Sequence, residues 1–264
     1  MTTKHHLSHA EELYWGTAHY APAHTQDARR GARMTPLTQV AIGSPIALDV
    51  NGMADGATST ELPNNATVTW TTADDGASPF DNADTPAVAS IVDATGATRS
   101  VWPLDVPRNL TIQVTHLSSI VAMSVTVTGF DQYGEKMVET LSVTATGTDK
   151  SAAGKKAFKS ILSMAVTSAG NATTNTLNLG WGDVLGLPYR IGANADVLSV
   201  FFNDAPDAAA TVVKADATTP TATTGDVRGT VDTTSAANGS RVIVWMKLEP
   251  ANRNSLFGLE QYAG

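Results

Sequence analysis

The sequence contains no cysteine and has few aromatic and few charged residues. The lack of cysteine excludes disulfides, thiolate metal sites, iron–sulfur clusters and cysteine nucleophiles. Charged residues make up 16% of the chain, below the usual quarter. No apolar run approaches the length of a membrane span, and the first residues have no apolar signal-peptide core. We therefore expect a protein that is made in soluble form, without a membrane segment or a conventional export signal.

The charge balance is acidic, with a formal net charge of −8 and a sequence pI near 5.1. A phosphate backbone would be repelled by such a surface, and no run of Lys and Arg reaches motif length. Nucleic acid is therefore not an expected partner. Residues 1–45 differ from the rest, because they carry a small positive balance and five of the six histidines.

Alternating residues in 125–146 predict a β-hairpin. Two runs rich in Val and Thr flank a polar loop at 131–136, which contains a glycine. In the second run Met137, Leu141 and Val143 share one face. Glu139 interrupts that face, which predicts a sheet edge there; a cation of a neighbouring chain at Glu139 would make the hairpin part of an oligomer contact.

Similar short strands continue along the chain, and the scarcity of Glu, Lys and Leu argues against helices. The last strand is apolar on both faces, so we expect it to be central in its sheet or covered by a neighbouring subunit. The predicted fold is all-β, an antiparallel β-sandwich or jelly-roll-like body with an extended N-terminal arm. We expect an irregular arm at 1–45, a short-stranded β segment at 46–105 that packs on the body, and the main β-sandwich domain at 106–264. The strands expected outside the hairpin lie at 46–50, 68–72, 87–93, 99–104, 110–115, 157–168, 175–183, 197–204, 210–218, 225–233 and 241–248.

The arm has no sustained period of either kind, and its aromatic side chains are costly to leave in water. We expect it to become ordered against a partner. The residues expected to bind that partner are Trp15, Tyr20, Arg29, Arg30 and Arg33.

Several stretches imitate functional motifs without meeting their requirements. Residues 147–158 resemble a phosphate-binding loop, but the glycines are seven apart and Lys156 stands where Ser or Thr is needed, so we predict an exposed loop. His116 has no placed carboxylate, and the acidic pairs near 74 and 81–84 fit turns better than a Ca²⁺ loop. We therefore expect no catalytic residue, no cofactor, no metal site and no enzyme. Four tryptophans could form a sugar platform or lie in the core: Trp70, Trp102, Trp181 and Trp245.

Four longer motifs within 106–248 carry a resemblance to a known class. They are FDQYGE, KAFKSI, GWGDVLGLP and GDVRGT. Together with the strands around them they resemble virion structural proteins of tailed bacteriophages. Residues 1–105 contribute nothing to this resemblance.

The resemblance implies a capsid decoration, or cement, protein: a β-rich homotrimer on the capsid exterior that binds major capsid protein subunits after synthesis in the bacterial cytoplasm. Many identical copies would strengthen attachment through multivalency. A tail or baseplate component is the structural alternative. A carbohydrate-binding adhesin module is a second alternative, and a lyase or depolymerase is a third.

Overall fold

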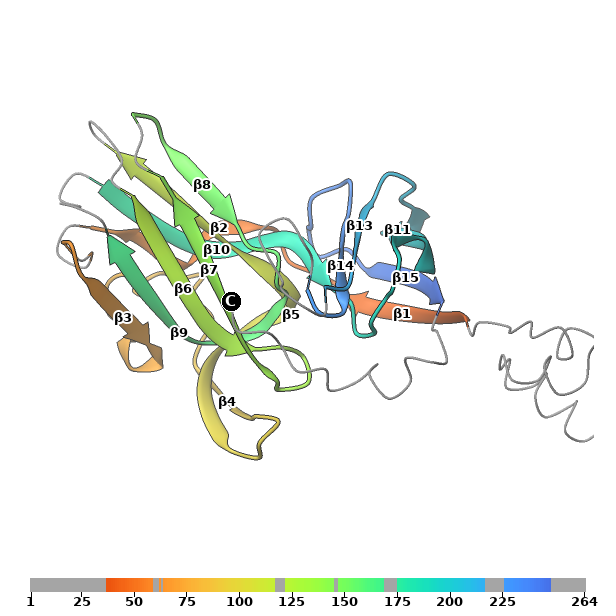
Figure 1. The fold of residues 1–264 in the computed structure, drawn as a ribbon, viewed down its shortest axis with the longest axis horizontal. Helices are drawn as coiled ribbons and strands as arrows, with labels where there is room; N and C mark the ends of the chain where they lie inside the picture. The colour runs from red at the N-terminus through yellow and green to blue at the C-terminus, as the bar shows by residue number, and fades with distance from the viewer. Residues whose placement is uncertain are drawn as a thin grey trace, which may run out of the picture.

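The computed structural model describes residues 37–58, 62, 64–116, 122–144, 147–168, 175–216 and 226–247. Within these ranges the chain forms antiparallel strands and two short 3-10 helices, η1 and η2 (Figure 1). The elements in chain order are β1 (Leu37–Gly43), β2 (Asp49–Ala57), β3 (Thr67–Thr71), η1 (Thr72–Asp74), β4 (Ala89–Val92), β5 (Thr98–His116), β6 (Met123–Phe130), β7 (Lys136–Val143), β8 (Lys150–Ala153), β9 (Phe158–Ser168), β10 (Asn175–Gly186), η2 (Asn194–Asp196), β11 (Val197–Phe202), β12 (Ala205–Pro206), β13 (Thr211–Lys214), β14 (Gly229–Asp232) and β15 (Val242–Lys247).

The larger part of the molecule is a sandwich made from one curled antiparallel sheet. One layer runs β2-β10-β5-β8, and the other runs β3-β9-β6-β7. The long strand β5 joins the layers, because its first half pairs with β9 and its second half with β10 and β8. The predicted all-β, sandwich-like fold is confirmed.

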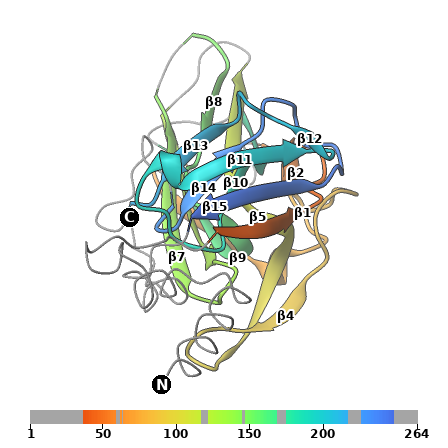
Figure 2. The same cartoon turned by 90° about the vertical axis from the view of Figure 1, so that its right-hand side faces the viewer.

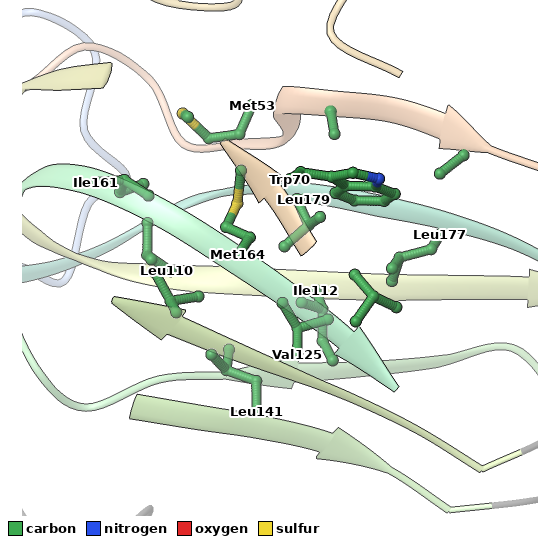
Figure 3. Packing of buried hydrophobic residues seen from close by; sticks show 14 of the residues in the cluster. Met53, Trp70, Leu110, Ile112, Val125, Leu141, Ile161, Met164, Leu177 and Leu179 are labelled. Carbon is green, nitrogen blue, oxygen red and sulfur yellow. The ribbon is translucent and has the colours of Figure 1, made fainter. Parts of the chain in front are cut away.

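The space between these layers is filled by a hydrophobic cluster, here called the large core. Figure 3 shows its side chains converging from strands of both layers. Three aromatic side chains form one corner: the Phe80 ring stacks on Trp102 at 4.7 Å and meets Trp70 edge-on at 5.6 Å. Met53 and Phe80, from the segment before residue 106, pack in the same cluster as the later strands.

The second hydrophobic cluster, here called the small core, lies beside the sandwich. A four-stranded sheet in the order β1-β15-β11-β12, here called the end sheet, covers it at the end of the molecule (Figure 2). The other side is built by β13, β14 and the last residues of β10, whose Val184–Gly186 stretch pairs with β14. β10 therefore runs from the large core into the small one (Figure 1).

Several strand predictions are confirmed. β6 and β7 form the expected hairpin, with Phe130 paired to Lys136 and the apolar face of β7 buried. β15 is central, as its two apolar faces predicted, because β1 and β11 flank it. Residues 37–43, expected as part of the arm, instead form β1.

The stretch at 147–158 differs from its prediction as an exposed loop. Its first half is exposed, but residues 150–153 form β8, which pairs with β5. Lys156 is only 2% exposed, and Phe158 is fully buried. The sequence did not indicate this burial, because two consecutive lysines usually lie on a solvated surface. Here the chain enters the sandwich interior at Lys156.

Among the described residues, no helix is long and apolar enough to cross a membrane.

Candidate functional site

The most unusual feature of the structure is a buried group of charged residues where the two cores meet. Asp131, Glu139, Lys156, Asp226 and Arg228 are each at most 8% exposed; together they are called the joint. Charged side chains are almost never buried to this extent unless they are paired. The burial of these five charged residues therefore requires specific partners inside the chain.

The joint brings together sequence motifs that lie far apart in the chain. Asp131 comes from the β6–β7 turn and forms an ion pair with Arg228, which precedes β14. The amide of Ala157, at the start of β9, donates to Asp226 Oδ2 at 3.1 Å. The FDQYGE, KAFKSI and GDVRGT motifs therefore meet at one place, and what they have in common is buried charge.

Asp131 organises the hairpin turn as well as the ion pair. Its Oδ1 accepts the backbone amides of Tyr133 at 2.8 Å and Glu135 at 2.9 Å, while Oδ2 accepts from Arg228 Nη2. The Arg228 guanidinium lies over the Tyr133 ring, 5.0 Å from its centroid, where a cation is attracted to the π face. Tyr133 donates its hydroxyl to the carbonyl of Pro188 at 2.6 Å, which adds the GWGDVLGLP motif to the contact.

Asp226 holds two segments through backbone amides. Its Oδ2 accepts from Ala157, as described above, and its Oδ1 accepts from the amide of Arg228 at 3.1 Å. The Arg228 guanidinium is also 4.0 Å from Oδ1. Because bonds between charged and neutral groups are strong when water is excluded, this carboxylate fixes β9 against the segment before β14.

Glu139 and Lys156 form the part of the joint nearest β7. The Glu139 carboxylate accepts the amides of Lys155 at 2.7 Å and Lys156 at 3.3 Å, and Lys156 Nζ donates to the carbonyl of Val138 at 2.6 Å. Burial raises the pKa of Glu139, although these amides oppose the shift, and burial lowers the pKa of Lys156. β7 is the last strand in the sheet order, so the predicted sheet edge at Glu139 is confirmed, and the partners of Glu139 shown here belong to its own chain.

A glycine makes this close approach feasible. A Cβ atom at Gly154 would overlap the Glu139 carboxylate. The side chain of Asn109 donates to the carbonyl of Gly154 at 3.0 Å and accepts the amide of Val184 at 3.1 Å. The backbone of the GKK sequence therefore binds the Glu139 carboxylate through the amides of its two lysines.

Arg108 forms a second buried cationic centre at the same junction. Its Nε donates to the carbonyl of Gly182 at 2.8 Å, and both terminal nitrogens reach the carbonyl of Ile46. It also pairs with Asp105 at 3.1 Å and Asp183 at 3.5 Å. Burial raises the pKa of Asp183, and the charge of Arg108 opposes that rise.

A groove of about 290 Å³ lies beside the joint. Gln132, Pro188 and Tyr189 line it on one side, and residues 39–42 of β1 line it on the other. The lining exposes more polar than apolar surface and includes the glutamines Gln39 and Gln132. Among the described residues, no three His, Cys, Asp or Glu side chains are grouped as a metal site requires.

The outer face of the end sheet is the second surface of interest. In β15 the residues Val242, Val244 and Met246 point into the small core, so Ile243 and Trp245 point outward. Trp245 is 38% exposed and is flanked in register by Gln39 and Ser199. Leu37 at the start of β1 is 57% exposed, and Leu198 of β11 is 46% exposed.

The described part of the chain begins and ends at one end of this sheet. β1 begins at Leu37 and β15 ends at Lys247, and these two residues are paired. Residues 1–36 and 248–264 therefore connect to the body at the same end of the same sheet. All the residues expected to bind a partner lie outside the described part of the chain: Trp15, Tyr20, Arg29, Arg30 and Arg33.

The four tryptophans considered for a sugar platform have different positions. Trp70, Trp102 and Trp181 are at most 5% exposed and belong to the large core. Trp102 and Trp181 also use their indole N–H inside the protein, on Asp75 and the carbonyl of Ala47. Only Trp245 of these four is exposed, so the four tryptophans do not form a shared sugar-binding platform.

Comparison of the chain with protein-family models, with curated proteins and with solved structures gives no match.

Proposed function

We propose that this protein is a non-enzymatic structural protein of a tailed-phage virion, which decorates the capsid exterior by binding between major capsid protein subunits. The observation that carries the proposal is that β1 begins and β15 ends at the same end of the end sheet, whose outer face exposes Trp245 and Leu37. A rigid face and an adjacent segment of 36 residues offer two linked contacts with a shell. Two linked contacts bind far more strongly than either alone.

The joint supports this proposal through rigidity. A protein that reinforces a shell transmits force only if its own parts do not move against each other. Buried, hydrogen-bonded charges tie the large core to the small core through Asp131, Asp226 and Arg228. Any opening between the cores would have to break these contacts together.

We further propose a homotrimer that uses the outer face of the end sheet. Trp245→Glu should convert the trimer to a monomer, because it would bury a charge in an apolar contact. Val92→Glu is the matched control: Val92 is 65% exposed on β4, which belongs to a different sheet, and the trimer should persist. Light scattering coupled to size-exclusion chromatography distinguishes the states, and a monomeric wild type would contradict the proposal.

The segment before β1 provides the capsid test. Shells of the encoding phage that lack this protein are incubated with wild type, with a variant lacking residues 1–36, or with Arg29, Arg30 and Arg33 changed to Ala. We expect reduced attachment for both variants and unchanged circular dichroism of the β body. Attachment equal to that of wild type would refute a role for the segment.

The two alternatives predict other locations and ligands. A labelled antibody on intact virions gives an icosahedral coat for a decoration protein and a focus at the tail end for a tail or baseplate component. An adhesin would bind host glycans through Trp245, and glycan-array binding lost in Trp245→Ala would favour it over decoration.

A further inference from the structure

Three side chains of the joint have the chemistry of an amide-forming reaction. Lys156 supplies an amine, and Glu139 and Asp226 supply carboxyl groups, with exposures of 2%, 8% and 1%. Condensation of an amine with a carboxyl group needs neither metal nor cofactor, but it requires the removal of water from both groups. A site this well buried meets that requirement.

The two carboxyl groups hold Lys156 between them. Glu139 binds the amides of Lys155 and Lys156, and Asp226 binds the next amide, that of Ala157. Lys156 Nζ turns back to the carbonyl of Val138, the residue before Glu139. Three consecutive amides thus fix the two acids, and the Lys156 amine interacts electrostatically with both of them.

The protonation states suit the roles of nucleophile and proton carrier. Burial lowers the pKa of Lys156, which increases the fraction of neutral amine, although the nearby Glu139 and Asp226 charges oppose this shift. Burial raises the pKa of Glu139, which makes this carboxyl a better proton acceptor than an exposed one.

We propose that Lys156 and Asp226 become joined by an intramolecular isopeptide bond. Lys156 first gives a proton to the Asp226 carboxylate, which makes both groups neutral. Its Nζ then attacks Cγ of Asp226 and forms the new C–N bond, and Glu139 accepts a proton from the nitrogen. Glu139 then gives that proton to the departing hydroxyl of Asp226, the C–O bond breaks, and one water molecule leaves. No oxidant or reductant is involved.

The surroundings of Asp226 stabilise the intermediate of this step. The amides of Ala157 and Arg228 each point at one of its carboxyl oxygens, and negative charge develops on oxygen when the carbon becomes tetrahedral. The product would link the start of β9 to the segment before β14 covalently. That bond would connect the large core to β14, which contributes Val231 to the small core. This cross-link goes beyond the proposed role on the capsid.

The test is the intact mass of the purified full chain followed by peptide mapping. We expect a mass lower than the sequence mass by one water molecule, and a branched tryptic peptide that contains Lys156 and Asp226. Lys156→Met and Glu139→Gln should restore the unmodified mass. Lys159→Met is the matched control, because Lys159 is a partly buried lysine that donates to the carbonyls of Leu104 and Asp105, and this variant should retain the loss of water.

A folded wild type with the full sequence mass would overturn the proposal. A loss of water that mapping places at an Asp–Gly step, such as Asp75-Gly76, would also overturn it, because that product is a succinimide. Hydroxylamine cleaves a succinimide and leaves an isopeptide bond intact, so the two products are distinguished on the same sample. Neither outcome bears on capsid attachment.

Discussion

Asp131 and Arg228 form an ion pair although 97 residues separate them in the chain. Their side chains are at most 3% exposed. Asp131 also caps the β6–β7 turn, and Arg228 lies over Tyr133 and near Asp226. The conformation of the hairpin turn and the contact between the large core and the small core consequently depend on the same ion pair.

Replacement of Arg228 by Met should be strongly destabilising. It leaves Asp131 buried without its cation, and removal of one partner of a buried pair costs about 3–5 kcal/mol of unfolding free energy. Urea denaturation followed by tryptophan fluorescence measures the loss. The double variant Asp131→Asn, Arg228→Met should lose less than the sum of the two single variants.

The exposed pair of Arg241 and Asp204 is the control for that experiment. Its side chains are 55% and 67% exposed. Arg241→Met should therefore cost less than about 1 kcal/mol, because solvent screens the pair. Equal losses for Arg228→Met and Arg241→Met would show that the joint contributes no special stability.

Gly180 in β10 should not tolerate even a methyl group. A Cβ atom there would overlap the carbonyl oxygen of Asp49 in β2. We expect Gly180→Ala to lower the free energy of unfolding by about 3 kcal/mol, since the backbone of β2 must move away. Gly147→Ala is the control: no atom lies within 4 Å of its Cβ position, and the change should stay within about 0.5 kcal/mol.

The strands were predictable because their signal is local. The alternation in 125–143 needs only neighbouring residues, and the turn around Gly134 has a positive φ of 79°. The central place of β15 followed from its two apolar faces. A two-residue periodicity determines such features wherever one face is buried.

The joint was not predictable because its signal is long-range. The acidic residue of a GDVRGT stretch and the lysines of GKKAF look like solvated surface residues, and only the tertiary fold shows that Asp226 and Lys156 are buried together. One hint was present: a charge shares a strand face with apolar residues, as Glu139 does between Met137 and Leu141. Such a residue can lie on an edge strand and still be bound inside the chain, as Glu139 is, and the sequence alone does not show its partners.

Asp232 in β14 should destabilise the fold when it is ionised. Burial, and then the neighbouring Asp183, raise the pKa of Asp232 above its ordinary value of 3.8. A raised carboxyl pKa means that the folded state binds the proton more tightly, so this residue's contribution weakens as the pH rises through that raised value. Asp232→Asn should add about 0.5–1 kcal/mol at pH 7, because the carboxyl is half-buried and solvent screens part of its charge.

The gain should vanish in acid, where Asp232 is protonated in both states. Denaturation curves at pH 7 and pH 3 test this difference directly. Asp84→Asn, at an exposed position, serves as the control. An Asp232→Asn gain that is the same at both pH values would show that packing of the amide, not the charge, is responsible.

Asp93 at the β4–β5 turn should show the opposite pH dependence. Hydrogen bonds from the Thr95 side chain and then from Arg99 lower its pKa well below the usual range, and the amide of Ala97 adds a further bond. A lowered carboxyl pKa contributes stability above the unfolded value near 3.8, and this contribution is lost as the pH falls toward the folded value. Hydrogen exchange at the amides of Thr95 and Ala97 should therefore be slow at pH 6 and should lose protection, relative to the strands of the large core, as the pH falls below 3. Asp93→Asn should lose that protection already at pH 6 while the sandwich remains protected, and unchanged exchange at both amides would show that the carboxylate does not hold the turn.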